Sequence, residues 1–264
     1  MKEKDEEFIK IPETNYSNKL FGKMECIKTL LKAMESHNHK FYEAIIGALP
    51  SEYLDCLYEK RISKTHLETF KKENASKLTF MKDFRSLEEL IYNYYLGLIV
   101  EVIAQKILNS LGHQCIRAGS DANFIEKDSA ASTEADLYIE SLNKSIEVKS
   151  TNFMSKYRAL AIKSYQIKKY INNDYDIFVM DYESYPGKIY FAWFPLKGRE
   201  LSEPVNFFGK ICQYVNLKGL TVHYLDFTKN NTASMKDRCF HFNTFNKLTL
   251  LSEVNQYSFK LACQ

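Results

Sequence analysis

The first third of the chain carries the apolar periodicity of helices. Apolar residues recur there every three or four positions, and Pro50 interrupts the pattern. The charged residues 1–16 show no apolar stripe, so we expect a frayed terminus there. A helical N-terminal region is expected over residues 17–90. Its predicted helices cover residues 20–35, 40–49 and 51–59, and a longer helix begins at residue 87.

Shorter apolar runs in the second half predict strands. Residues 134–149 are expected to form an antiparallel hairpin that turns at residues 142–145, because Asn143 tolerates turn conformations. Pro186 and Gly187 mark another turn between two strands. The remaining strands are predicted at residues 114–117, 175–182, 188–194 and 220–227.

Three polar residues of the predicted hairpin suit phosphodiester hydrolysis. Asp136, Glu147 and Lys149 alternate with apolar neighbours, so they can share one face. Carboxylates bind Mg²⁺ through few protein ligands and several waters. A lysine can orient or help deprotonate water and stabilise developing negative charge. Two registers stay open: a two-residue turn at Asn143 and Lys144 would place Lys149 nearer to Asp136 than Glu147 is, whereas a bulge would correct this.

This arrangement resembles the PD-(D/E)xK nuclease superfamily. The motif here is Asp136, a ten-residue spacer and Glu147-Val-Lys149, with Ala135 where the family has proline. The resemblance covers residues 101–190 and is greatest to type II restriction endonucleases. It implies an α/β, restriction-endonuclease-like core over residues 91–264 with a mixed central sheet flanked by helices. It also implies one or two Mg²⁺ ions, hydrolysis of double-stranded DNA, and a homodimer.

Two further residues are candidates for the same site. Glu101 stands in an apolar helical window, where an unpaired carboxylate is costly, so it is a candidate metal ligand unless it reaches solvent. Residues 164–170 are expected to be helical, with Gln166 and Tyr170 on one face. This pattern is similar to the glutamine-containing helix of RecB-like exonucleases and repair nucleases. Gln166 is therefore a candidate for positioning water or phosphate, although a solvated helix face explains it equally well.

Positive charge is concentrated around the motif. The whole chain has a net charge of only +3, so any contact with nucleic acid must come from local patches. Residues 143–171 carry seven lysines and arginines and a single acid, Glu147. Such a bias suits contacts to phosphates. The candidate DNA contacts are Lys156, Arg158, Lys163 and Arg117.

Other classes of function find little support. The chain has no glycine-rich phosphate loop, so no nucleotide cofactor is indicated. Its six cysteines are scattered and no secretory pattern opens it, which favours reduced thiols in the cytoplasm. Apolar windows are too short for a membrane span. Two alternatives to a restriction enzyme stay open: a repair or recombination nuclease acting on ends, flaps or junctions, and a noncatalytic nucleic-acid-binding protein.

Overall fold

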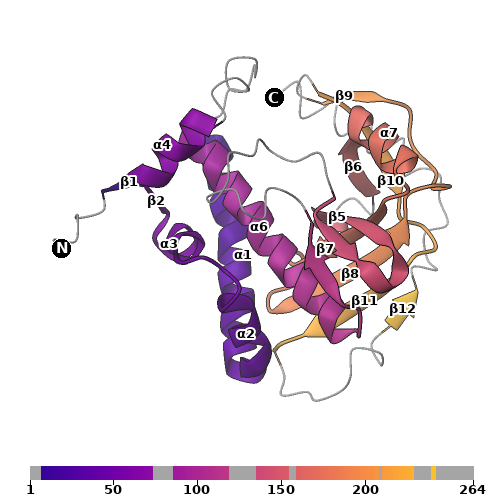
Figure 1. Ribbon diagram of the computed structural model, residues 1–264, viewed down its shortest axis with the longest axis horizontal. Coiled ribbons are helices and arrows are strands. Elements are labelled where there is room, and N and C mark those ends of the chain that lie inside the picture. The colour runs from indigo at the N-terminus through magenta and orange to yellow at the C-terminus, as the bar shows by residue number, and fades with distance from the viewer. Residues whose placement is uncertain are drawn as a thin grey trace.

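A mixed β-sheet flanked by helices forms the centre of the molecule (Figure 1). This computed structural model describes residues 7–73, 86–118, 135–154, 159–207, 210–228 and 239–241. The sheet strands in these ranges are β3 (Cys115–Arg117), β4 (Leu137–Ile139), β5 (Lys144–Ser150), β7 (Asp176–Asp181), β8 (Lys188–Pro195), β11 (Thr221–Asp226) and β12 (Cys239–His241). Their order is β12-β11-β8-β7-β5-β4-β3. Among these described neighbours, β5 and β7 alone run parallel, so the predicted α/β class with a mixed sheet is confirmed.

The N-terminal part is helical, as its periodicity predicted. Its helices are α1 (Asn15–His37), α2 (His39–Ile46), α3 (Ser51–Glu59), α4 (Lys64–Glu73) and α6 (Leu87–Ser110). Figure 1 shows α6 between the other helices and the sheet. Among the described helices, none combines the length and apolar composition that a bilayer crossing requires.

The expectation of a frayed terminus over residues 1–16 is wrong for part of that segment. Phe8–Lys10 form β1, which pairs antiparallel with β2 (Arg61–Ser63), and α1 begins at Asn15. The Ile11 side chain is only 5% exposed and packs in the core with the helices. A short charged segment therefore becomes structured through a distant strand partner and a few buried apolar side chains, neither of which gives a local periodic pattern.

Each face of the sheet packs against its own hydrophobic core. Side chains alternate along β7, so Phe178 and Met180 join the core that includes α1 and α6. Ile177 and Val179 point to the other face and join a second core. The first core extends from the helical region into the sheet without interruption. The boundary expected between residues 90 and 91 falls inside α6, so helices and sheet fold around shared side chains.

A smaller sheet and one helix cover the second face. The helix is α7 (Ser164–Asn172), and the strands are β6 (Ala159–Lys163), β9 (Val205–Phe207) and β10 (Lys210–Asn216), in the order β6-β10-β9. Ile167 and Tyr170 of α7 are buried in the second core. The sequence predicted α7 but not these three strands. β6 is a mostly apolar run and β9 and β10 mix apolar and polar residues, so none of them shows a sustained alternation. Their position fixes α7 against β5 and β7.

One buried carboxylate connects the starts of α1 and α6. Glu89 is 2% exposed and its Oε2 accepts the backbone N–H of Ser86 at 2.8 Å, while Ser86 Oγ accepts the N–H of Glu89. This reciprocal pair is a capping box. The other oxygen of Glu89 accepts the hydroxyl of Thr14, the N-cap of α1. The N-cap residues of both long helices therefore bond to the same carboxylate, that of Glu89.

We expect Glu89→Ala to lower the free energy of unfolding by about 2–3 kcal/mol, because it removes a cap and leaves buried donors unpaired. Urea denaturation monitored by circular dichroism measures the change. Glu88→Ala is the matched control, since Glu88 lies in the same helical turn without these bonds, and its expected cost is below about 0.5 kcal/mol. Equal losses in the two variants would contradict the capping role.

Candidate active site

The hairpin of β4 and β5 places two carboxylates opposite each other. A short 3-10 turn, Glu140–Leu142, leads into Asn143, whose φ of 48° is left-handed. Leu137 pairs with Ile146, and one further step in this register sets Asp136 opposite Glu147. A two-residue turn at Asn143 and Lys144, which would have moved Lys149 closer to Asp136, is therefore wrong. The turn lies earlier in the chain, and no bulge is needed.

Asp136 is held at the start of β4 by backbone bonds on both sides. Its Oδ2 accepts the N–H of Val148 in β5 at 2.7 Å. Its carbonyl oxygen accepts the N–H of Ala118, just after β3, at 3.1 Å. The Asp136 carboxylate is thus fixed against β5, next to Glu147 in that strand.

Glu147 is the most buried acid of the hairpin, at 7% exposure. Its Oε1 accepts a hydrogen bond from the ammonium of Lys149 and a second one, at 2.6 Å, from the hydroxyl of Tyr170. The Lys149 Nζ also lies 5.6 Å from the centroid of the Tyr170 ring. Both hydrogen bonds end on the same oxygen, and among the described residues no bond reaches Oε2.

The charges of this cluster keep Lys149 protonated. Burial works against the ammonium, but Glu147, Asp136 and Glu101 outweigh it and raise the pKa of Lys149 above its ordinary value. Burial, and then Glu147 and Asp136, raise the pKa of Tyr170 far above the ordinary range. A raised lysine pKa stabilises the fold at every pH below the ordinary lysine value, and this contribution is lost as the pH rises through the folded pKa. At neutral pH the site therefore contains an ammonium and a neutral phenol.

Glu101 and Arg117 form a second ion pair on the other face of the sheet. Arg117 pairs with Leu137 in the register, so it faces α6, and its NH2 lies 3.6 Å from Glu101 Oε2. The Nε and NH2 atoms of Arg117 are buried and make no hydrogen bond. The charges of this ion pair also act on Tyr53. Burial raises the pKa of Tyr53 to about 12, while Arg117 lowers this pKa and Glu101 raises it. Glu101 is close enough to raise the pKa of Lys149, and it forms an ion pair with Arg117.

The remaining candidates are placed as follows. Gln166 is half-buried on α7, and the contact to Glu147 is made by Tyr170, one turn later. Lys163, at the end of β6, reaches the hydroxyl of Tyr165 at 3.5 Å. Lys156 and Arg158 lie outside the described residues. Arg117 is a half-buried partner of Glu101, with a side chain 17% exposed.

The oxygen donors fit a hard divalent cation with few protein ligands. Asp136 and Glu147 are hard carboxylates on adjoining strands, and both raise the pKa of Lys149, so their combined negative charge already attracts a cation to this point. Among the described residues, no three His, Cys, Asp or Glu side chains gather closely enough to hold a metal ion. Two carboxylates, completed by water and phosphate, are consistent with Mg²⁺ rather than with a metal held entirely by protein.

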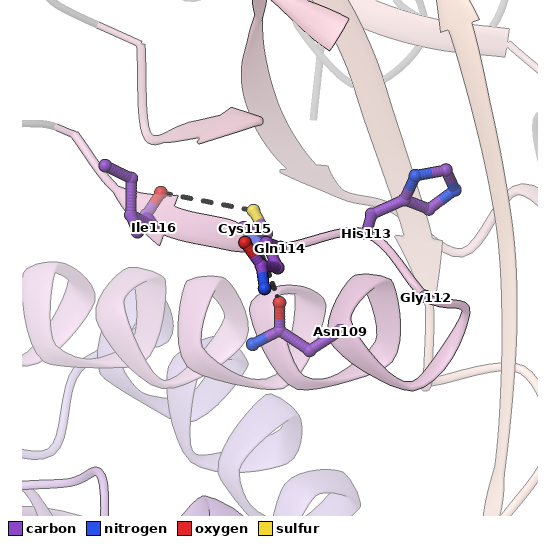
Figure 2. Close-up of a pocket in the computed structure, with 6 residues that line it drawn as sticks. All are labelled: Asn109, Gly112, His113, Gln114, Cys115 and Ile116. Atoms are coloured by element: carbon purple, nitrogen blue, oxygen red, sulfur yellow. Dashed lines mark hydrogen bonds between the residues drawn. The ribbon is translucent and has the colours of Figure 1, made fainter. Parts of the chain in front are cut away.

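A pocket of about 430 Å³ lies elsewhere, beside the C-terminal end of α6 (Figure 2). Figure 2 shows Asn109 reaching from the helix to β3, where its Oδ1 accepts the N–H of Cys115 at 2.8 Å. Asn109 follows Glu101 by eight residues, or about 12 Å along the helix. The lining contains no carboxylate and no lysine or arginine: it consists of Asn109, Gly112, His113, Gln114, Cys115 and Ile116. It does not belong to the carboxylate site.

Comparisons with protein-family models, with curated proteins and with solved structures give no match for this chain. The function is therefore argued from the residues and their geometry.

Two partners of the acids were missed by reasoning from the sequence. Tyr170 shares a helical face with Gln166, and this spacing was the available signal, but the sequence does not say which of the two reaches β5. The pairing of Arg117 with Glu101 had no signal at all, because the two residues meet only when β3 returns along α6.

We expect Tyr170→Phe to lower the free energy of unfolding by about 1.5–3 kcal/mol, because a buried carboxylate loses a hydrogen bond while the ring is retained. Tyr165→Phe, on the same helix, is the control and should change stability by less than about 0.5 kcal/mol, because Tyr165 is exposed. Urea denaturation of both variants provides the measurement. An unchanged midpoint for Tyr170→Phe would mean that the bond to Glu147 contributes nothing.

Proposed function

We propose that this protein is a Mg²⁺-dependent deoxyribonuclease with a restriction-endonuclease-like core, which hydrolyses phosphodiester bonds in double-stranded DNA. The observation that carries the proposal is the convergence of Asp136 and Glu147 on the ammonium of Lys149 at one end of a β-hairpin. Acids on adjoining strands next to a lysine are the groups that phosphodiester hydrolysis requires. A sequence-specific type II restriction enzyme acting as a homodimer is the form that the motif favours.

Each residue has a role that follows from its contacts. Asp136 and Glu147 would hold Mg²⁺, which supplies Lewis-acid activation of water and phosphate when bound. Lys149 remains an ammonium, so its role is to orient water and to stabilise the negative charge that develops on phosphate, rather than to remove a proton. Tyr170 fixes the Glu147 carboxylate through its hydroxyl. Glu101 adds negative charge near Lys149 and is itself balanced by Arg117.

The surface next to the acids suits a polyanion. Residues 159–172, which form β6 and α7, contain Lys163, Lys168 and Lys169 and no Asp or Glu. Lys168 and Lys169 extend from the helix that contacts Glu147, and Lys163 directly precedes it, so a phosphate backbone could approach the acids along them. Lys156 and Arg158 stay proposed contacts of the same kind, and Gln166 stays a proposed water- or phosphate-positioning residue.

A second candidate is a repair or recombination nuclease that acts on DNA ends, flaps or junctions. The observation that favours it is the hydrogen bond from Tyr170 to Glu147, because it brings the helix containing Gln166 and Tyr170 directly to the acids. Circular plasmid DNA distinguishes the two activities. Discrete linear fragments with defined ends support a restriction enzyme, whereas cleavage that requires a free end supports an end-processing enzyme.

We expect Asp136→Asn, Glu147→Gln and Lys149→Met each to reduce Mg²⁺-dependent cleavage by about 10²–10³-fold or more, because each removes a charge from the reacting centre. Cleavage of plasmid and of linear DNA, followed by sequencing of the new ends, measures rate and specificity together. Lys144→Met is the matched control: it removes a lysine of the same strand that pairs with Asp174 and Asp176, away from the acids, and should leave the rate unchanged.

Full cleavage by Lys149→Met would exclude the assigned role. DNA binding without Mg²⁺-dependent cutting by the wild-type protein would support the noncatalytic alternative, a nucleic-acid-binding protein with a nuclease-like fold.

Metal binding has a readout that is independent of cleavage. Mg²⁺ at 100 times its dissociation constant should stabilise the folded protein by about 2.7 kcal/mol, measured as a rise in the thermal midpoint. Asp136→Asn and Glu147→Gln should abolish this rise. Asp174→Asn is the control, since Asp174 is an exposed acid of another ion pair, and it should respond as the wild type does. An identical response in all variants would place the metal elsewhere.

A further inference from the structure

The helix that contacts Glu147 also presents an aromatic ring to solvent. Tyr165, in the first turn of α7, is 65% exposed, the highest value among the exposed large hydrophobic side chains in the described ranges. The opposite side of α7 buries Ile167 and Tyr170 in the second core. A ring left uncovered at the start of a well-packed helix is available to a partner.

Positive charge surrounds this ring. The Lys163 Nζ lies 5.7 Å from the ring centroid and 3.5 Å from the hydroxyl. Lys168 follows Tyr165 by three residues, so it lies on the same side of the helix. Lys169 follows by four residues, and its Nζ lies 5.9 Å and 5.7 Å from the ring centroids of Tyr170 and Tyr175. No acid occurs in β6 or α7. An aromatic face among lysines is complementary to a ligand that is both aromatic and anionic.

The ring is also close to the proposed reacting centre. Tyr165 precedes Tyr170 by five residues, or about 7.5 Å along the helix axis, and Tyr170 donates to Glu147. Tyr165 contributes to the raised pKa of Tyr170, which agrees with this proximity. A strand of nucleic acid whose phosphate reached the acids would therefore have a neighbouring nucleotide within reach of Tyr165.

We propose that Tyr165 stacks on an unpaired nucleobase beside the scissile phosphate, so that the preferred substrate is duplex DNA with a single-stranded extension. This inference rests on the nuclease function proposed above, in its second form that acts on DNA ends, flaps or junctions, and names its substrate class. Paired bases are covered on both faces within a duplex, so an exposed ring can stack only on a base that has left the helix or was never paired. The lysines around the ring would contact the flanking phosphates.

The test measures binding in the absence of cutting. Two fluorescein-labelled duplexes of the same sequence, one blunt and one with a single-stranded extension, are titrated with the full-length protein in Ca²⁺ and EDTA buffers, and anisotropy reports affinity. We expect Tyr165→Ala to weaken binding of the extended duplex roughly 5- to 150-fold, the range for loss of one stacked base. Binding of the blunt duplex should change by less than about twofold, and Tyr165→Phe should bind both duplexes as the wild type does.

The matched control is Tyr58→Ala. Tyr58 is 44% exposed and has the Lys28 Nζ at 6.0 Å from its ring centroid, but it lies on α3 in the helical region. It should not change either affinity. A 2-aminopurine base in the extension adds a direct signature of stacking: its fluorescence should fall on binding to wild type and Tyr165→Phe, but not to Tyr165→Ala.

The outcomes separate this inference from the nuclease function. Unchanged binding by Tyr165→Ala, or an equal loss for blunt and extended duplexes, would overturn the stacking role even if the wild type cuts DNA. Tyr165-dependent binding of the extension by a wild type that cuts nothing in Mg²⁺ would overturn the nuclease function alone. Failure of the wild type to bind either duplex would overturn the stacking role.

Discussion

The ion pair between Glu147 and Lys149 is the interaction on which the centre of this structure depends. Glu147 is 7% exposed, and a buried carboxylate without a partner is strongly destabilising. Lys149 lies two residues later on the same strand face and supplies the balancing charge. Tyr170 supplies a second donor and joins α7 to β5. The strand, the helix and the charge balance are therefore coupled.

The sheet separates two groups of charges while keeping them close. Alternation along β3, β4 and β5 puts Arg117 on the face of α6 and puts Asp136, Glu147 and Lys149 on the face of α7. Glu101 pairs with Arg117, yet it still acts on Lys149. The two hydrophobic cores lie on opposite faces of the sheet, because the central strands β7 and β8 contribute alternate residues to each of them. A change of charge in one group is thus expected to shift pKa values in the other.

Periodicity predicted most of the elements near the site. Alternating residues identified the hairpin, and the motif identified Asp136, Glu147 and Lys149. These three residues lie on one face of the hairpin, as expected. The register was not predictable, because it depends on where the chain reverses, and the left-handed Asn143 after a 3-10 turn decided it. Strands β1, β2, β6, β9, β10 and β12 escaped prediction because strands without strong alternation form only when distant partners complete their hydrogen bonds.

The sequence by itself determined the class of fold, the hairpin and the types of group available for chemistry, since these follow from local periodicity and from side-chain identity. Tertiary structure decided which of those groups meet. It brought Lys149 and Tyr170 into contact with Glu147, and it paired Arg117 with Glu101. The physical reason is that a buried charge is satisfied by whichever partner the packing of helices against the sheet brings within hydrogen-bonding distance, and that packing depends on contacts between residues far apart in the chain.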